Sequence, residues 1–404
     1  MWEAIAANKR KSVVLITAMG MLMIGAGMLI AESIAPGAWL AGGGIAFTLW
    51  ALLALASYYG GDGIFLASVG AKKIEKQDHP MLFNIVEEMC IAAGLSTMPK
   101  IYIVDDPRPN AFAVGRDPAH ASVAVTAGLL NRLNRDEVQG VVAHELAHVH
   151  NRDILYVMIA AVMVGVIALM SDFFLRYLWF TGGRHRGRRK GGDQAQAVIL
   201  IIGIALAILG PIAAQLLYFA LSRKREYLAD ACGAQFSRYP EGLASALEKI
   251  ASDPGLRDQK NRAMAPMYIV NPAAAAAFAA IGLTSTHPPT KERIRILRSM
   301  GGASLADYEA AFTQAEGGSS IIPRSALKTA RPVGVRPAWR EDETARPAVD
   351  AREKARETAD LLWKLNKYGI IACACGARLK VPPGFTRPQV ACPRCRRVHD
   401  VPRA

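Results

Sequence analysis

Cysteine, aromatic and charged residues are all scarce in this chain of 404 residues. Of the six cysteines, four lie close to the C-terminus in metal-like spacing, which favours a reducing compartment over a disulfide framework. Aromatic residues make up 7% and do not interleave with the basic ones, which argues against nucleic-acid binding despite a net charge of +14. Only 20% of the residues are charged and 52% are apolar, a composition that indicates a membrane protein with soluble parts.

Long apolar runs interrupt the chain at four places. A helix needs about 20 apolar residues to cross a bilayer, and four runs approach or exceed that length: 12–31, 37–59, 154–170 and 195–221. We predict two transmembrane helices within residues 1–60 and a hydrophobic hairpin over residues 154–221. A cleaved signal peptide is the alternative for the first run, but that run exceeds a typical signal core and a second one follows at once.

Basic residues beside the runs predict their orientation. Lys9, Arg10 and Lys11 precede the first run, so the N-terminus and the soluble parts are expected on the cytoplasmic side, near anionic lipid. The loop between the third and fourth runs is also basic and would lie outside if both runs cross, against this tendency. Whether the hairpin of residues 154–221 crosses fully therefore stays open.

The segment His144-Glu145-Leu146-Ala147-His148 is the strongest motif of the chain. The residues before it, 134–137, form a capping box that predicts a helix. Because residues four apart share one helix face, His144 and His148 can bind one zinc ion, with Glu145 beside the open coordination position as general base. Two stacked core histidines are the alternative, which leaves Glu145 unexplained. We expect this helix to continue into the apolar run that begins at residue 154.

A third metal ligand is expected directly after the fourth apolar run. Glu226 and Asp230 are four residues apart, and therefore share a face of the predicted helix. Glu226 can bind the zinc ion, while Asp230 can accept a hydrogen bond from a ligand imidazole and fix its orientation. A solvated surface helix carrying two acidic residues beside three basic ones is the alternative.

The residues before the motif predict a peptide-binding strand. A helix is expected from His79-Pro80 to Gly94, followed by strands at 100–104, 110–115 and 122–126. An open edge strand can pair with an extended peptide through main-chain hydrogen bonds, so the candidate substrate-binding residues are Asn110, Ala111, Phe112 and Ala113. An ordinary sheet edge without a ligand is the alternative.

HExxH followed by ExxxD after a hydrophobic hairpin resembles the HtpX-type membrane zinc metalloproteases, which are gluzincins related to the CAAX-prenyl proteases. The resemblance covers about residues 10–300 and includes the segments 110–115, 144–148 with Asp153 beyond, 226–230, and 285–289 with Arg293 and Ile294 after them. It implies zinc ligation by His144, His148 and Glu226, with Glu145 as general base. It also implies quality control of misfolded or membrane proteins in a bacterial-type inner membrane.

Four further positions are weighed as parts of this site. His287, ahead of Pro288-Pro289, either caps a helix or reaches the scissile carbonyl oxygen and stabilises the oxyanion. Arg293 on the following helix can fix a nearby carboxylate or lie on a solvated face. Residues 267–270 can wall the cleft, and His150 faces away from His148 and is expected to be structural.

The remaining residues predict a linker and a small metal-binding module. Residues 301–367 lose apolar periodicity and are expected as a linker with a short helix near 351–367. Residues 368–404 resemble a zinc ribbon in which four thiolates hold a second, structural zinc ion: Cys373, Cys375, Cys392 and Cys395. The first pair is CxC where CxxC is usual, and His399 can replace a cysteine. Binding or positioning of a protein is the expected use, and a nucleic-acid knuckle is the alternative.

Together these expectations define an α+β, predominantly α architecture. It is a four-span helical membrane protein with a cytoplasmic gluzincin-like metalloprotease domain, split into residues 61–153 and 222–300, and a small C-terminal β ribbon. Its partners would be polypeptide substrates and the lipid bilayer, without nucleic acid. Three alternatives remain. The first is a processing protease for prenylated tails, which needs more than four spans. The others are a non-enzymatic zinc-containing scaffold that binds partners through its ribbon, and a membrane-tethered nucleic-acid binder that uses the basic tail.

Overall fold

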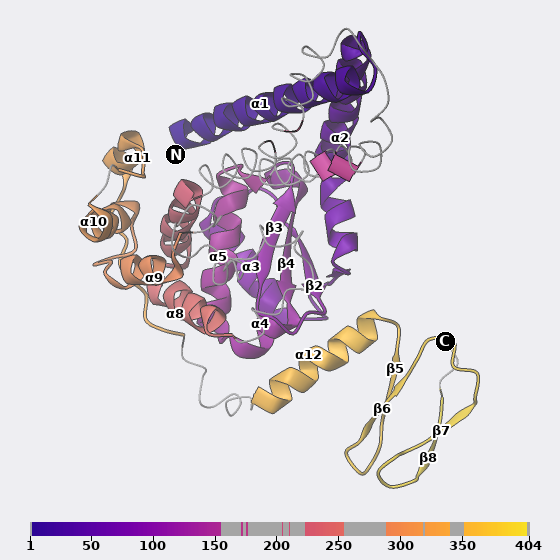
Figure 1. Cartoon of the computed structure of the whole chain (residues 1–404). Coiled ribbons are helices and arrows are strands. Elements are labelled where there is room, and N and C mark those ends of the chain that lie inside the picture. The colour runs from indigo at the N-terminus through magenta and orange to yellow at the C-terminus, as the bar shows by residue number, and fades with distance from the viewer. Residues whose placement is uncertain are drawn as a thin grey trace.

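The computed structural model describes the N-terminal helices, most of the central body and the C-terminal module (Figure 1). The described residues are 2–154, 171–172, 175–176, 204, 210, 223–253, 288–317, 320–339 and 351–401. The apolar runs at 154–170 and 195–221 therefore lie almost entirely outside the described residues. Residues 267–270 and His287 also lie outside them.

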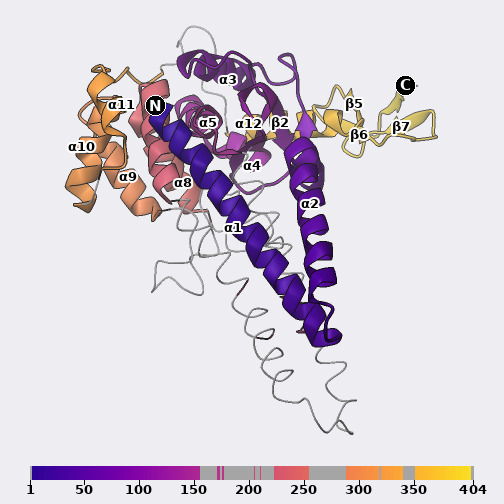
Figure 2. The same cartoon turned by 90° about the horizontal axis from the view of Figure 1, so that it is seen from above.

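Helices α1 (Trp2–Ile34) and α2 (Trp39–Ser68) form a long hairpin that projects from the body (Figure 2). Small residues allow the close crossing of the two helices, because a Cβ atom on Gly27 would lie 2.5 Å from the Cβ of Ala46. Large apolar side chains such as Leu40 and Ile45 remain exposed, as expected of a surface that contacts lipid. Among the described residues α2 is the one helix long and apolar enough to cross a membrane, and α1 contains a shorter apolar stretch.

A four-stranded sheet in the order β1-β2-β4-β3 lies at the centre of the body. Strand β2 (Lys100–Val104) runs parallel to β4 (Ala121–Thr126), while β1 (Lys72–Lys73) and β3 (Ala111–Gly115) pair antiparallel at the two edges. The three strands predicted from the sequence are confirmed, with β3 at an edge. Alternate residues point to opposite faces: Ile103 and Val125 face the main core, whereas Phe112 and Ala124 pack with Leu66 of α2.

Helices cover the other face of the sheet (Figure 1). Helix α3 (Pro80–Ala92) begins as predicted, since His79 caps it by accepting a hydrogen bond from the N–H of Leu82. After α4 (Ala127–Arg132), helix α5 (Arg135–His150) packs between α3, the sheet and α8 (Pro240–Ala251), and α8 in turn packs against α9 (Thr290–Arg298). Residues 223–237 form a further helix.

The expectation that the HExxH helix continues into the next apolar run is wrong. Helix α5 ends at His150, and residues 151–153 form a turn in which Arg152 has a positive φ of 57°. The turn brings Asp153 back towards the helix, where its N–H donates to the carbonyl of His148. The end of α5 at His150 therefore places the Asp153 carboxylate beside His148.

The expectation of a linker is also wrong for the described residues 301–317 and 320–329, whereas the short helix expected near 351–367 is present. Helix α10 (Leu305–Glu316) starts at a capping box of Ser304 and Asp307, and α11 (Arg324–Thr329) follows it. Both helices pack onto the main core, with Tyr308 fully buried. This segment contains few large apolar residues. Those of α10 lie on one face of the helix, which is enough to pack it against the main core.

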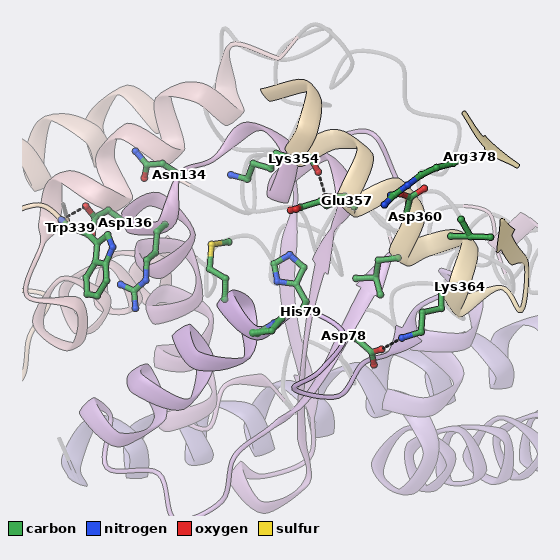
Figure 3. Close-up of a pocket in the computed structure, with 16 residues that line it drawn as sticks. Asp78, His79, Asn134, Asp136, Trp339, Lys354, Glu357, Asp360, Lys364 and Arg378 are labelled. Carbon is green, nitrogen blue, oxygen red and sulfur yellow. Dashed lines mark hydrogen bonds and ion pairs between the residues drawn. The ribbon is translucent and has the colours of Figure 1, made fainter. Parts of the chain in front are cut away.

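Helix α12 (Ala351–Leu365) and two hairpins form the C-terminal module. Leu361 and Leu362 join the main core, so α12 is docked on the body. A cavity of about 1070 Å³ lies between α12, the start of α3 and the start of α5 (Figure 3). The hairpins pair β5 (Gly369–Ala372) with β6 (Arg378–Val381) and β7 (Gln389–Ala391) with β8 (Val398–Asp400).

Candidate metal centre

Helix α5 carries both histidines of the HExxH motif into the interior. Its predicted capping box is present, because Asn134 accepts a hydrogen bond from the N–H of Glu137 and Glu137 accepts one from the N–H of Asn134. His144 and His148 lie one turn apart with ring centroids separated by 4.9 Å and planes at 89°. His144 is only 1% exposed, so its polar ring atoms need partners inside the protein.

The helix of residues 223–237 brings a carboxylate to these rings. Glu226 Oε2 lies 3.5 Å from His144 Nε2, and Glu226 Oε1 lies 3.5 Å from His148 Nε2. Gly233 permits the approach of the two helices, because a Cβ atom there would lie 3.1 Å from the backbone N and Cα of His144. The three residues that the sequence predicts as metal ligands are thus brought together.

Two further carboxylates fix the orientation of the imidazoles. His144 Nδ1 lies 3.0 Å from Asp230 Oδ1, and His148 Nδ1 lies 3.2 Å from Asp153 Oδ2. Each Nδ1 thus lies beside a carboxylate oxygen, and each Nε2 faces Glu226. This is the arrangement in which an outer carboxylate sets the tautomer of a metal-binding histidine.

Arg293 completes the support of this cluster. Its guanidinium donates two hydrogen bonds to Asp230, of 2.8 Å from Nε and 2.7 Å from Nη2. Both side chains are fully buried. Burial would raise the pKa of Asp230, but Arg293 outweighs it and holds the pKa below its ordinary value. Arg293 therefore fixes a carboxylate, which is one of the two sequence-based expectations for it.

The donor set fits a divalent metal ion. The ligand atoms of His144, His148 and Glu226 all lie within 4.8 Å of one another. Each imidazole nitrogen lies 3.5 Å from a different oxygen of Glu226, which leaves room for an ion bound at about 2.0 Å between the two rings and the carboxylate. Burial would lower the pKa of His148, but Asp153 outweighs it, and with Glu226 raises the pKa to about 10. The cluster thus favours a positive charge at the position of an ion.

The other predicted residues occupy separate places. Glu145 is 94% buried next to His144 on α5, which packs against β3 and β4. Within the described part of the chain β3 pairs with β4 alone, so its other edge carries no strand. Asn110 is buried before β3, and its N–H donates to Thr126 Oγ1. His150 contacts Phe236 rather than the cluster, as expected of a structural residue.

Four cysteines form a second cluster in the C-terminal module. Cys373 Sγ lies 3.4 Å from Cys395 Sγ and 3.5 Å from Cys375 Sγ, and the Sγ atoms of Cys375 and Cys392 are 3.6 Å apart. A zinc ion with bonds of about 2.3 Å to sulfur requires separations of about 3.8 Å. A hydrogen bond from the N–H of Cys395 outweighs burial and lowers the pKa of Cys392 to about 6, whereas burial and the neighbouring thiols outweigh the N–H of Cys375 and raise the pKa of Cys373. The thiolate that binds metal is therefore favoured at Cys392 first.

Two features near the first cluster could not be predicted from the sequence. One is the need for glycine at position 233, which only the helix crossing reveals. The other is the contact of Arg336 with Asp136 and Gln139 of α5, in which the partners are separated by about 200 residues of sequence. Neither feature has a motif or a periodicity that would mark it.

An HExxH helix whose histidines meet a glutamate from a second helix defines the class of metallopeptidases. The model of "Peptidase family M48" matches residues 76–301. A "Protease HtpX homolog" of Dictyoglomus thermophilum is 43% identical over 302 residues, covering 74% of this chain and 95% of that relative. One of Caldanaerobacter subterraneus is 46% identical, covering 60% of this chain and 80% of the relative. The chain belongs to peptidase family M48 and, within it, to the HtpX-type metalloproteases.

A solved structure also matches at a greater distance. The crystal structure of S. mikatae Ste24p is 21% identical, with a TM-score of 0.39, and the match covers 74% of this chain and 67% of that chain. The family assignment rests on the sequence relatives and on the metal centre, and the predictions of a metalloprotease and of an HtpX-type protein are confirmed.

Proposed function

We propose that this membrane metalloprotease is a zinc-dependent endopeptidase that hydrolyses peptide bonds of misfolded or membrane proteins. The observation that carries the proposal is the convergence of His144, His148 and Glu226 next to Glu145. A non-enzymatic scaffold has no use for a buried glutamate beside a complete set of ligands, because an unused buried carboxylate costs stability.

His144 and His148 would hold the zinc ion through Nε2, and Glu226 would hold it through its carboxylate. Zinc bound there lowers the pKa of a water molecule and polarises the scissile carbonyl. The carboxylate of Glu145 would take a proton from that water and pass it to the nitrogen of the leaving amine. His287 is proposed to donate a hydrogen bond to the carbonyl oxygen as negative charge develops on it.

Strand β3 is the proposed holder of the substrate backbone. The edge of β3 that pairs with no described strand can bind an extended peptide through the main chain of Ala111 and Ala113, with Asn110 just before the strand and Phe112 within it. Such pairing contacts few side chains of the substrate. It therefore suits a protease that acts on unfolded polypeptides of many sequences.

The proposed setting is a bacterial-type inner membrane with the site on the cytoplasmic side. Support comes from the apolar α1–α2 hairpin and the basic residues before its first apolar run. In this multi-pass arrangement lipid surrounds the exposed apolar side chains of α2. Trypsin should remove the ribbon, defined as residues 369–401, only from vesicles whose cytoplasmic face is outside; removal from the opposite orientation alone would reverse the proposed topology.

The ribbon is proposed to hold a second, structural zinc ion through its four cysteines. Metal analysis of the full-length protein should then give two zinc ions per chain. His144→Ala should reduce the content to one, because the cysteine cluster is unchanged. A content of two in that variant would exclude His144 as a ligand.

Glu145→Gln tests the assignment of the base. The variant should retain both zinc ions and lose about 10² to 10⁴-fold in the rate of casein cleavage, the usual contribution of general acid–base catalysis. A chelator should abolish cleavage by the unmodified protein. Glu87→Gln makes the same change at an exposed position of α3 and should leave the rate unchanged. Full activity of Glu145→Gln would show that another group takes the proton.

A further inference from the structure

Residues 331–339, here called the strap, cross the body outside the segment that the family model matches. The match ends at residue 301, and the strap follows α11. It lies at the ends of the two helices that carry the candidate ligands. The N–H of Arg336 donates to the carbonyl of Arg238, and the side chain of Arg238 donates back to the carbonyl of Gly334 at 3.3 Å.

Arg336 contacts both of these helices with one guanidinium group. Its Nη2 donates to Asp136 Oδ1 and to Gln139 Oε1, both at 2.6 Å, on the first turns of α5. Its Nε donates to the carbonyl of Ser237 at 3.0 Å, at the last residue of the helix that carries Glu226. A guanidinium presents several donors in a fixed plane, so these bonds hold the two helix ends at one separation.

Trp339 strengthens the contact with α5. The backbone N–H of Trp339 donates to Asp136 Oδ2 at 2.7 Å (Figure 3). Because Arg336 binds Oδ1, both oxygens of Asp136 are bound by the strap. The guanidinium of Arg135 stacks on the indole ring of Trp339 at 3.8 Å. Asp136 also lies in the first turn of α5, where a negative charge is favoured by the helix dipole.

The contact lies at a distance from the metal centre but on the same pair of helices. Asp136 precedes His144 by eight residues, or about 12 Å of helix, and Ser237 follows Glu226 by eleven residues, or about 16 Å. At the level of His144, Gly233 packs directly against the backbone of α5. A change in the spacing of the helix ends would therefore pivot the helices about this close contact and move Glu226 relative to the imidazoles.

We propose that Arg336 is a positioning residue for the metal centre. It holds the helix of Glu226 at the spacing from α5 that Glu226, His144 and His148 require to bind one ion. The site of this chain thus depends on a segment outside the family-matched domain. The inference rests on the proposed zinc ligands but not on the proposed cleavage of peptides.

The test compares full-length Arg336→Ala with Arg331→Ala, a matched change at an exposed position of the same strap. Both are loaded with cobalt(II), whose visible bands report ligand geometry, and the unchanged cysteine cluster cancels in the difference spectrum. For Arg336→Ala we expect shifted bands, loss of metal to a chelator about tenfold faster, and about tenfold lower kcat at unchanged KM. Arg331→Ala should match the unmodified protein in all three.

Two further variants separate positioning from general stability. Leu362→Ala removes apolar packing of α12 and should lower the melting temperature without moving the cobalt bands. Arg336→Lys keeps the charge but loses the planar donors, and should give an intermediate spectrum even if Arg336→Ala does not fold. A lower melting temperature in both Arg336 variants, with the cobalt bands and metal retention of the unmodified protein, would overturn the proposal. Altered bands without any proteolysis by the unmodified protein would support the positioning role and contradict the proposed function instead.

Discussion

His144 and Cys392 belong to two candidate metal sites that differ in what surrounds them. His144 lies within the main core, in contact with a second helix and a carboxylate that is itself held by Arg293. Cys392 is covered chiefly by its own module, whose buried core consists of Cys373, Leu379 and Cys392. The fold of the body positions the ligands of the first site. In the second site, the cysteines themselves supply most of the contacts that would hold the two hairpins together.

The difference predicts opposite relations between metal and folding. A packed core keeps the ligands of the first site in place whether or not an ion is bound, so the free energy of metal binding is available for affinity and catalysis. A ribbon with only four buried side chains, Cys373, Leu379, Val381 and Cys392, cannot offset the loss of chain entropy without its ion. Metal in the ribbon would therefore be required for folding, as in other small zinc modules.

Removal of metal should give the largest difference in stability between the two sites. After chelation, the amides of residues 369–401 should lose protection from hydrogen exchange, because structural zinc contributes on the order of 10 kcal/mol to such modules. The amides of α5 should keep their protection. Cys395→Ser should have the same effect on the ribbon, while Cys90→Ser in α3 should not. A ribbon that stays protected without metal would remove the distinction between the sites.

Loss of Arg293 should destabilise the body strongly. Arg293→Leu leaves the carboxylate of Asp230 buried without its guanidinium partner, at a cost of about 3 to 5 kcal/mol in the free energy of unfolding. Arg298→Leu on the same helix removes exposed pairs with Glu241 and Glu248 and should cost at most about 1 kcal/mol. Chemical denaturation in detergent measures both. Equal effects would mean that burial does not set the strength of these pairs.

Asp230→Asn should weaken the first site without affecting the second. The amide keeps the shape of Asp230 but loses the charge that orients His144, so the affinity for zinc should fall about 10 to 100-fold. Competition with a chelator of known affinity measures the change. Asp400→Asn, on an exposed strand of the ribbon, is the matched control. An unchanged affinity would show that His144 does not need this carboxylate.

The sequence predicts the parts of the first site that are local. His144, Glu145 and His148 follow from helix periodicity, the start of α5 follows from its capping box, and Glu226 follows from its spacing to Asp230. The four cysteines of the ribbon were likewise identified by spacing, and they do lie together. In each case the chemistry is carried by residues that are close in sequence.

Contacts over long separations could not be predicted in this way. The residues that hold Arg336 precede it by about 100 and 200 positions, and its surroundings have the Pro- and Arg-rich composition expected of a linker. Only the tertiary fold places the strap beside α5. The end of α5 at His150 was missed for a related reason, since an apolar run four residues later favoured a continuous helix.

The smallest effect is expected where α12 meets the body, at the ion pair of Lys364 and Asp78. Lys364 is 66% exposed, so Lys364→Ala should cost at most about 1 kcal/mol in the free energy of unfolding, in contrast to the buried pair of Arg293.

The pKa of Asp78 is lowered mainly by the N–H of Glu75 and only secondarily by Lys364. A lowered pKa stabilises the fold above the ordinary pKa of the carboxyl group, and this contribution disappears as the pH falls through the lowered value. The N–H of Glu75 remains in the variant. Unfolding curves of Lys364→Ala between pH 2 and pH 6 should therefore keep most of the acid dependence of stability that the unmodified protein shows. Loss of this acid dependence would mean that Lys364, and not the backbone, holds Asp78 ionised.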